Sequence, residues 1–137
     1  MITADNSLEN SETSQIKNIS LIKLILLLRK IGFNATHKGT WHIAKIVEFC
    51  HINKICELES LTKIYKNYTD FKKIKYTDRF KWNIQDSIDY MENNPYTDKE
   101  LLCSIFIEYR CYETVSCLKF LEALLLYVEF HLNLFLE

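Results

Sequence analysis

Apolar residues recur three and four positions apart along most of the chain, which is the spacing of one face of an α-helix. Only 2 Gly and 1 Pro occur among the 137 residues, fewer turn residues than a β-sheet protein needs. The breaks between apolar runs outline about six helices, near residues 14–31, 41–51, 59–71, 78–92, 97–110 and 116–137. The pattern therefore predicts an all-α fold, a compact bundle of about six helices.

Short polar side chains and one glycine mark where these helices begin and end. Ser14 or Ser20 is placed to cap the first helix, Thr40 the second and Thr77 the fourth. Gly32 is placed to end the first helix, because glycine readily adopts the backbone conformation that follows a helix C-terminus.

The two ends of the chain differ in what they can bury. Residues 1–15 are polar, and we predict a disordered N-terminal tail there, followed by a single helical domain over residues 16–137. The first helix has a dense apolar set, including Ile19, Ile22 and Leu26, and should be mostly buried. The last helix is apolar almost all round, which predicts burial within the domain or against a second copy.

The segment 59–91 has the pattern of a helix-turn-helix, with a turn at residues 72–76 that holds three lysines. A helical wheel of the second helix in this segment groups its apolar residues into one arc, formed by Phe80, Ile84, Ser87, Ile88 and Met91. The opposite arc carries Trp82, Gln85, Asp86 and Asp89. In DNA-binding proteins of this type, such an open face enters the major groove.

The net charge of −1 is unevenly distributed along the chain. Residues 37–82 carry 10 basic and 5 acidic side chains, a net charge of +5, whereas residues 83–137 carry 3 basic and 10 acidic ones, a net charge of −7. This asymmetry favours a polyanionic partner for the central segment alone.

Three stretches together resemble a known family: IGFNATHKGTWHI (31–43), SLTKIY (60–65) and the Thr-Asp-Arg of residues 77–79. They resemble the C-terminal DNA-binding effector domain of the stage-zero sporulation response regulator, over roughly residues 16–92. The resemblance implies a cytoplasmic transcription regulator that binds double-stranded DNA at a promoter site through a helix-turn-helix. Since only about 15 residues precede the first helix, we do not expect the receiver domain that full-length members carry.

Some residues keep the family pattern and others depart from it. Lys38 and Gly39 match the family's Lys-Gly turn, Arg79 matches an arginine that begins the recognition helix, and Lys63 matches a lysine of the preceding helix. The departures lie on the DNA-facing side, where arginines are replaced by Trp82 and Gln85 and a histidine is replaced by Asp86.

For DNA binding we expect two sets of contacts. Arginine pairs with guanine, glutamine with adenine, and an acid accepts from cytosine, so base reading is predicted for Arg79, Trp82, Gln85 and Asp86. Phosphate contacts are predicted for basic side chains and for one helix start, namely Lys38, Lys63, Lys72, Lys73, Lys75, Thr77 and Lys81.

A second hypothesis is a protein-interaction module that binds little or no DNA. Trp82 is flanked on the open face by Asp78, Asp86 and Asp89, and an exposed tryptophan among acids is more typical of a protein contact than of a phosphate-facing surface. Such a protein would form a homodimer, or would act as a partner or antagonist of a full-length regulator. Both hypotheses stay open from the sequence.

Other functional classes find little support. The five cysteines form no CxxC pair and indicate reduced thiols, and the cluster of His37, His42, Cys50, His51 and Cys56 lacks the close pairs of a zinc site. No glycine-rich phosphate loop, HExxH or nucleophile elbow is present, so we expect no catalytic residues, metal or cofactor. Charged residues interrupt the apolar runs, so no membrane-spanning segment is predicted.

Overall fold

The computed structural model describes residues 18–106 and 116–137. They form six α-helices and a short 3-10 helix: α2 (Leu21–Ile31), α3 (Lys38–Ile52), α4 (Leu61–Lys72), α5 (Asp78–Asn93), α6 (Lys99–Ile105), α7 (Cys117–Phe130) and η2 (Leu132–Leu134). The predicted all-helical bundle is confirmed over these residues. The predicted tail and residues 107–110 of the helix expected at 97–110 lie outside the described residues, and α6 already ends at Ile105.

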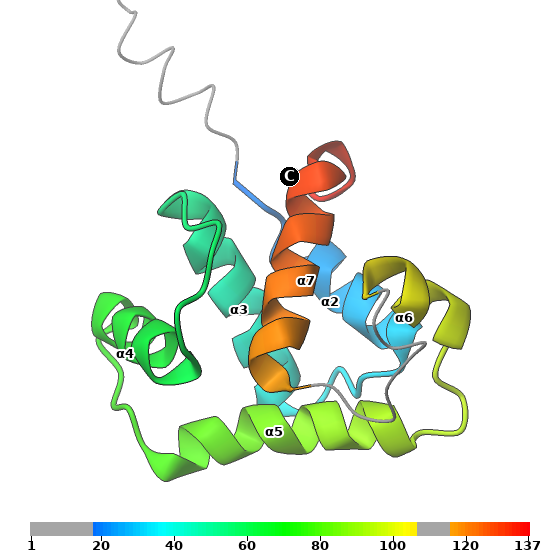
Figure 1. The fold of residues 1–137 in the computed structure, drawn as a ribbon, viewed down its shortest axis with the longest axis horizontal. Coiled ribbons are helices and arrows are strands. Elements are labelled where there is room, and N and C mark those ends of the chain that lie inside the picture. The colour runs from blue at the N-terminus through cyan, green and yellow to red at the C-terminus, as the bar shows by residue number, and fades with distance from the viewer. Residues whose placement is uncertain (1–17, 107–115) are drawn as a thin grey trace, which may run out of the picture.

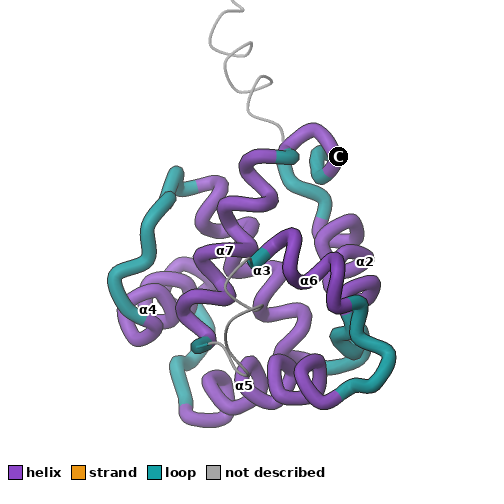
Figure 2. Tube along the Cα trace, turned by 45° about the vertical axis from the view of Figure 1, so that its right-hand side comes forward, coloured by secondary structure: helices purple, strands orange, loops and turns teal. Residues whose placement is uncertain are grey.

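Helix α3 lies at the centre of the bundle and contacts α2, α5 and α7. In Figures 1 and 2, α5 runs along one end of the molecule, α4 lies on one side, and α2 and α6 lie on the other. The core includes Ile43 and Val47 of α3, Ile84 of α5 and Leu124 of α7, each at most 1% exposed. The outward face of α5 is consequently left free of the rest of the bundle.

Five of the six described α-helices begin with a side-chain cap, because their first N–H groups have no partner within the helix. In each, the side chain accepts a hydrogen bond from the N–H three residues later, and the caps are Ser20, Ser60, Thr77, Asp98 and Ser116. The predicted caps Ser20 and Thr77 are confirmed.

The start of α3 differs from the sequence prediction. Thr40 is not the cap, since its hydroxyl donates a hydrogen bond of 2.8 Å to the carbonyl oxygen of Asn34. The helix instead begins at Lys38, and His37 occupies the capping position without a side-chain hydrogen bond. Thr40 therefore ties the preceding loop to α3, and Lys38 belongs to the first helical turn.

The burial predicted for α2 is only partly correct. Ile19 is buried, but Ile22 is 59% and Leu26 53% exposed. The buried face of α2 is formed by Leu24, Ile25, Leu28 and Ile31. The exposed Ile22 and Leu26 lie on the side of α2 that also carries its three basic residues, and the buried residues lie opposite.

The C-terminal helix is shorter than predicted, because α7 ends at Phe130. The chain turns through η2 and returns to the start of the domain, where the Ser20 N–H donates to the carbonyl oxygen of Phe135 at 2.7 Å. Leu126 and Phe130 remain 60% and 84% exposed, so α7 is buried on one side only. None of the described helices has the length and apolar character needed to cross a membrane.

Candidate functional site

Helix α5 is held by its inner face and exposes its outer face. Phe80, Ile84, Ser87, Ile88 and Met91 are each at most 5% exposed, which confirms the predicted core arc. The Thr77 hydroxyl caps the helix by accepting from the Phe80 N–H at 3.2 Å. The four predicted base-reading residues, Arg79, Trp82, Gln85 and Asp86, are all exposed.

The crossing of α3 and α5 is close enough to require a glycine. A Cβ atom added at Gly39 would meet the carbonyl oxygen of Asn83 and would lie 2.5 Å from the Ser87 hydroxyl oxygen. The two helix backbones therefore touch at this point. Since Lys38 precedes Gly39, the crossing also places Lys38 beside α5.

The loop before α3 is fixed by hydrogen bonds between polar side chains and the backbone. Asn34 Oδ1 accepts from the Thr36 N–H at 2.9 Å, and Trp41 Nε1 donates to the Ala35 carbonyl oxygen at 2.7 Å. These bonds act with the Thr40 bond to hold the start of α3, and with it Lys38, in one position.

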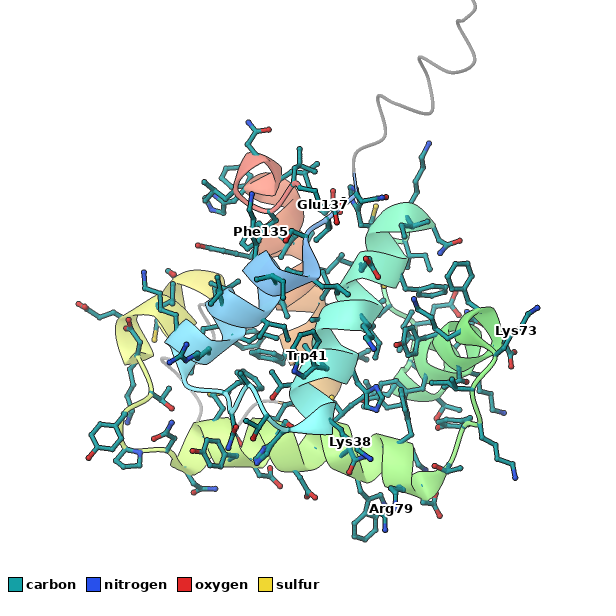
Figure 3. All side chains as sticks on the ribbon, turned by 180° about the vertical axis from the view of Figure 1, so that it is seen from behind. Lys38, Trp41, Lys73, Arg79, Phe135 and Glu137 are labelled. Atoms are coloured by element: carbon teal, nitrogen blue, oxygen red, sulfur yellow. The ribbon has the colours of Figure 1, made fainter. Side chains whose placement is uncertain are left out.

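Basic side chains gather around the first half of α5. Figure 3 shows Lys38 and Arg79 where α3 crosses α5, whereas Lys73 lies farther away, at the end of α4. Lys81 Nζ lies 3.2 Å from Asp78 Oδ1, in a pair of which Asp78 is 86% exposed. A pair so accessible to water contributes little stability, so Lys81 is free to exchange Asp78 for another anion.

The other lysines predicted to contact phosphate differ in whether a carboxylate accompanies them. Lys63 pairs with Glu59 at 2.6 Å, and Lys72 Nζ lies 4.0 Å from a Glu48 oxygen of α3. Lys73 ends α4 in the left-handed conformation with φ 59°, and Lys75 is exposed in the following turn. The turn thus contributes Lys73 and Lys75 as cations without a described ion pair.

The second half of the outer face is acidic and borders a cleft of about 530 Å³ between α4 and α5. Leu61 and Tyr65 of α4, Tyr76 of the turn and Trp82 form its apolar walls. Trp82 is 67% exposed. Asp86 and Asp89 also line this cleft, which the sequence did not reveal.

In the sequence, the α4 residues that line the cleft have the same pattern as residues that pack in a core. Leu61 and Tyr65 are four residues apart on one face of α4, and Tyr65 is indeed buried. Tyr65 nevertheless also lines the cleft, and its ring centroid lies 5.3 Å from that of Phe80 in α5.

His42 lies beneath the basic end of α5, with its ring centroid 4.6 Å from that of Phe80. Burial lowers the pKa of His42, and the nearby charges of Lys45 and Lys38 lower it further. His42 therefore stays neutral at pH 7 and is not one of the cations of this surface. In residues 18–106 and 116–137, no group of three or more His, Cys, Asp or Glu side chains is arranged to hold a metal ion.

These features define an all-helical protein with an exposed helix that is basic at its start and acidic beyond its middle. A scan against models of protein families found no match, and searches among curated proteins and among solved structures found none either.

Proposed function

We propose that the protein is a DNA-binding transcription regulator of the sporulation-initiation type, with α4 and α5 as its helix-turn-helix. The observation that supports this function best is the row of exposed polar and aromatic side chains on α5. It begins at Arg79, about one turn before the crossing with α3 at Asn83, and the opposite face of the helix is fixed in the core. A rigid helix with an open face is the element that direct reading of the major groove requires.

Base reading is assigned to three of the four predicted side chains; Asp86 is left out because its carboxylate repels the phosphates. Arg79 and Gln85 are six residues apart, which corresponds to about 9 Å along a helix and spans two to three base-pair steps. Arg79 is suited to guanine, Gln85 to adenine and Trp82 to a thymine methyl group. Gln85 Nε2 donates to Asp89 Oδ1 at 2.9 Å, so Gln85 must exchange this partner to pair with adenine.

Phosphate contacts are assigned to Lys38, Lys73, Lys75 and Lys81, and to the free N–H groups at the start of α5. The positive end of a helix attracts anions, and here it lies at Thr77, next to the lysine turn. Lys63 and Lys72 should contribute less, since carboxylates already accompany them.

The acids of α5 determine how the helix enters the groove. Asp86 and Asp89 lie along its second half and repel phosphates, whereas the basic groups lie at its start. We therefore expect α5 to enter by its N-terminal end, with its C-terminal half tilted away from the DNA backbone.

The test begins with selection of binding sequences from a random duplex DNA library, followed by titration of the selected duplex at several salt concentrations. Lys38→Ala should weaken all duplexes alike and should lower the slope of log K against log salt by about 0.9. Arg79→Ala should relax the preference at one base pair, with a loss of about 1–3 kcal/mol for the selected sequence.

Lys54→Asn is the matched control. Lys54 is exposed at the opposite end of α3 and has a φ of 55°, a conformation that asparagine tolerates well. Its replacement removes one positive charge from the protein but should leave the salt slope unchanged. Absence of salt-sensitive binding to every duplex in the library would refute the proposed function.

A further inference from the structure

We infer that the cleft between α4 and α5 is a binding site for a segment of a partner protein, one that carries a large apolar side chain next to lysine or arginine. This inference goes beyond DNA binding and does not depend on it. It rests on three properties of the cleft, namely its size, its walls and its unbalanced charge.

The cleft has the size and the walls of a site for an apolar anchor. Its volume of about 530 Å³ lies within the range of small binding pockets, about 300–1,000 Å³. Three of its apolar walls are aromatic: Tyr65 is buried, Tyr76 half-buried and Trp82 exposed. A partly exposed tryptophan beside a preformed apolar hollow is the usual composition of a protein-binding hot spot.

The charge of the cleft selects a basic partner. Among the described residues, Asp86 has no ion pair or hydrogen bond, and Asp89 accepts only from the neutral amide of Gln85 through its side chain. The one lysine that lines the cleft, Lys81, also lies 3.2 Å from Asp78. Two carboxylates therefore stand against one lysine in the lining of the cleft, and a lysine or arginine of the partner would balance the excess negative charge.

The aromatic wall also accepts a cation. Lys81 Nζ lies 5.8 Å from the centroid of the Tyr76 ring, within the range of a cation–π contact. Since Lys81 already lies at the Tyr76 ring, a basic side chain of the partner would pair with Asp86 and Asp89 instead. A polyanion such as DNA would gain nothing from these carboxylates, which is why we assign the cleft to a basic protein segment.

The experiment uses the two tryptophans of the chain, Trp41 and Trp82, as internal reporters. In a ¹⁵N-labelled protein each indole N–H gives one NMR signal, and a Trp82→Phe variant assigns them. The full chain is titrated with a nonapeptide that has a central leucine flanked by two lysines on each side. A second nonapeptide has glutamates in place of these lysines.

The lysine peptide should shift the Trp82 indole signal in a saturable manner. The Trp41 signal should stay in place, because that indole donates to Ala35 within the domain. Trp82→Ala should weaken binding of a fluorescent lysine peptide at least about tenfold, and Asp86→Asn about threefold, as expected for an exposed ion pair. Tyr96→Ala is the matched control, because Tyr96 is 89% exposed and does not line the cleft.

Three results would overturn the inference. The first is a Trp82 signal that neither peptide shifts, and the second is equal binding of the lysine and glutamate peptides. The third is a Trp82 shift that depends on protein concentration without peptide, which would assign the cleft to a second copy of the chain.

Discussion

Replacing Gly39 by alanine tests whether the backbone contact between α3 and α5 organises the site. The added methyl group would meet the Asn83 carbonyl oxygen and the Ser87 hydroxyl. The carbonyl belongs to the backbone of a helix whose inner face is packed in the core, so it cannot turn away as a flexible side chain would. The two helices must separate at the point that places Lys38 beside α5.

The expected magnitude follows from two opposing effects. Overpacking of a well-packed site costs about 1–3 kcal/mol, and a clash with helix backbone belongs at the upper end of that range. Alanine favours a helix over glycine by about 1 kcal/mol, which offsets part of the loss. The net destabilisation should be about 2 kcal/mol, which for a chain of this length lowers Tm by roughly 6–10 °C.

Thermal and urea unfolding followed by circular dichroism measure this change. Asn67→Ala provides the control for helix propensity, since Asn67 is exposed in α4 and alanine should raise Tm slightly there. The Gly39→Ala/Ser87→Gly double variant should recover only part of the loss, because the Asn83 carbonyl remains in the way. A Gly39→Ala protein as stable as the wild type, or more stable, would refute a direct backbone contact.

Three further changes probe the surroundings of α5. Thr77→Ala should destabilise the protein by about 1 kcal/mol in urea unfolding through loss of the helix cap, whereas Thr77→Ser should retain most of the stability. If both variants lost the same stability, the hydroxyl of residue 77 would not act as a cap. Ser87→Ala should be neutral or stabilising by up to about 1 kcal/mol, because the buried Ser87 hydroxyl has no hydrogen-bond partner among the described residues, and a clear loss of stability would reveal one. His42→Phe should flatten the fall in stability on acidification from pH 7 to pH 5, measured by urea unfolding at each pH. Because folding lowers the pKa of His42, the unfolded chain binds the proton first on acidification, at the ordinary histidine pKa of about 6.5, and the folded state loses stability. A pH dependence of stability that is the same in His42→Phe and the wild type would show that His42 is not the cause.

The sequence predicts packing well where polar residues show the orientation of a helix. In α5, the charged and amide residues left only one arc for burial, and Phe80, Ile84 and Ile88 occupy it. In α2 the charged residues are few, and the exposed Ile22 and Leu26 lie on the side of the helix that also carries Lys23, Arg29 and Lys30. The density of apolar residues alone therefore overstated how much of this helix is buried.

The candidate site was predictable residue by residue but not as a surface. Exposure of Arg79 and Trp82 follows from the wheel of α5 alone. The cleft needs Tyr65 of α4 and Tyr76 of the turn to come together with Trp82, and each tyrosine taken alone resembles a core residue. Local periodicity carries no information on the angle between two helices, so the cleft appears only in three dimensions.

The two proposed ligands share Trp82, and this overlap gives a prediction that neither proposal makes alone. DNA and the lysine peptide should exclude each other, because the indole cannot lie in the major groove and against a peptide at the same time. The two ligands have opposite charges: Arg79 should contact only DNA, and Asp86 should pair only with a lysine of the peptide.

Asp86→Asn should therefore weaken peptide binding and strengthen DNA binding, since the same carboxylate attracts lysine and repels phosphate. Arg79→Ala should weaken DNA binding and leave the peptide affinity unchanged. Fluorescence anisotropy of a labelled duplex, with unlabelled peptide added, measures the competition directly. A ternary complex, or an Asp86→Asn variant whose two affinities change in the same direction, would show that the acidic half of α5 does not distinguish the ligands.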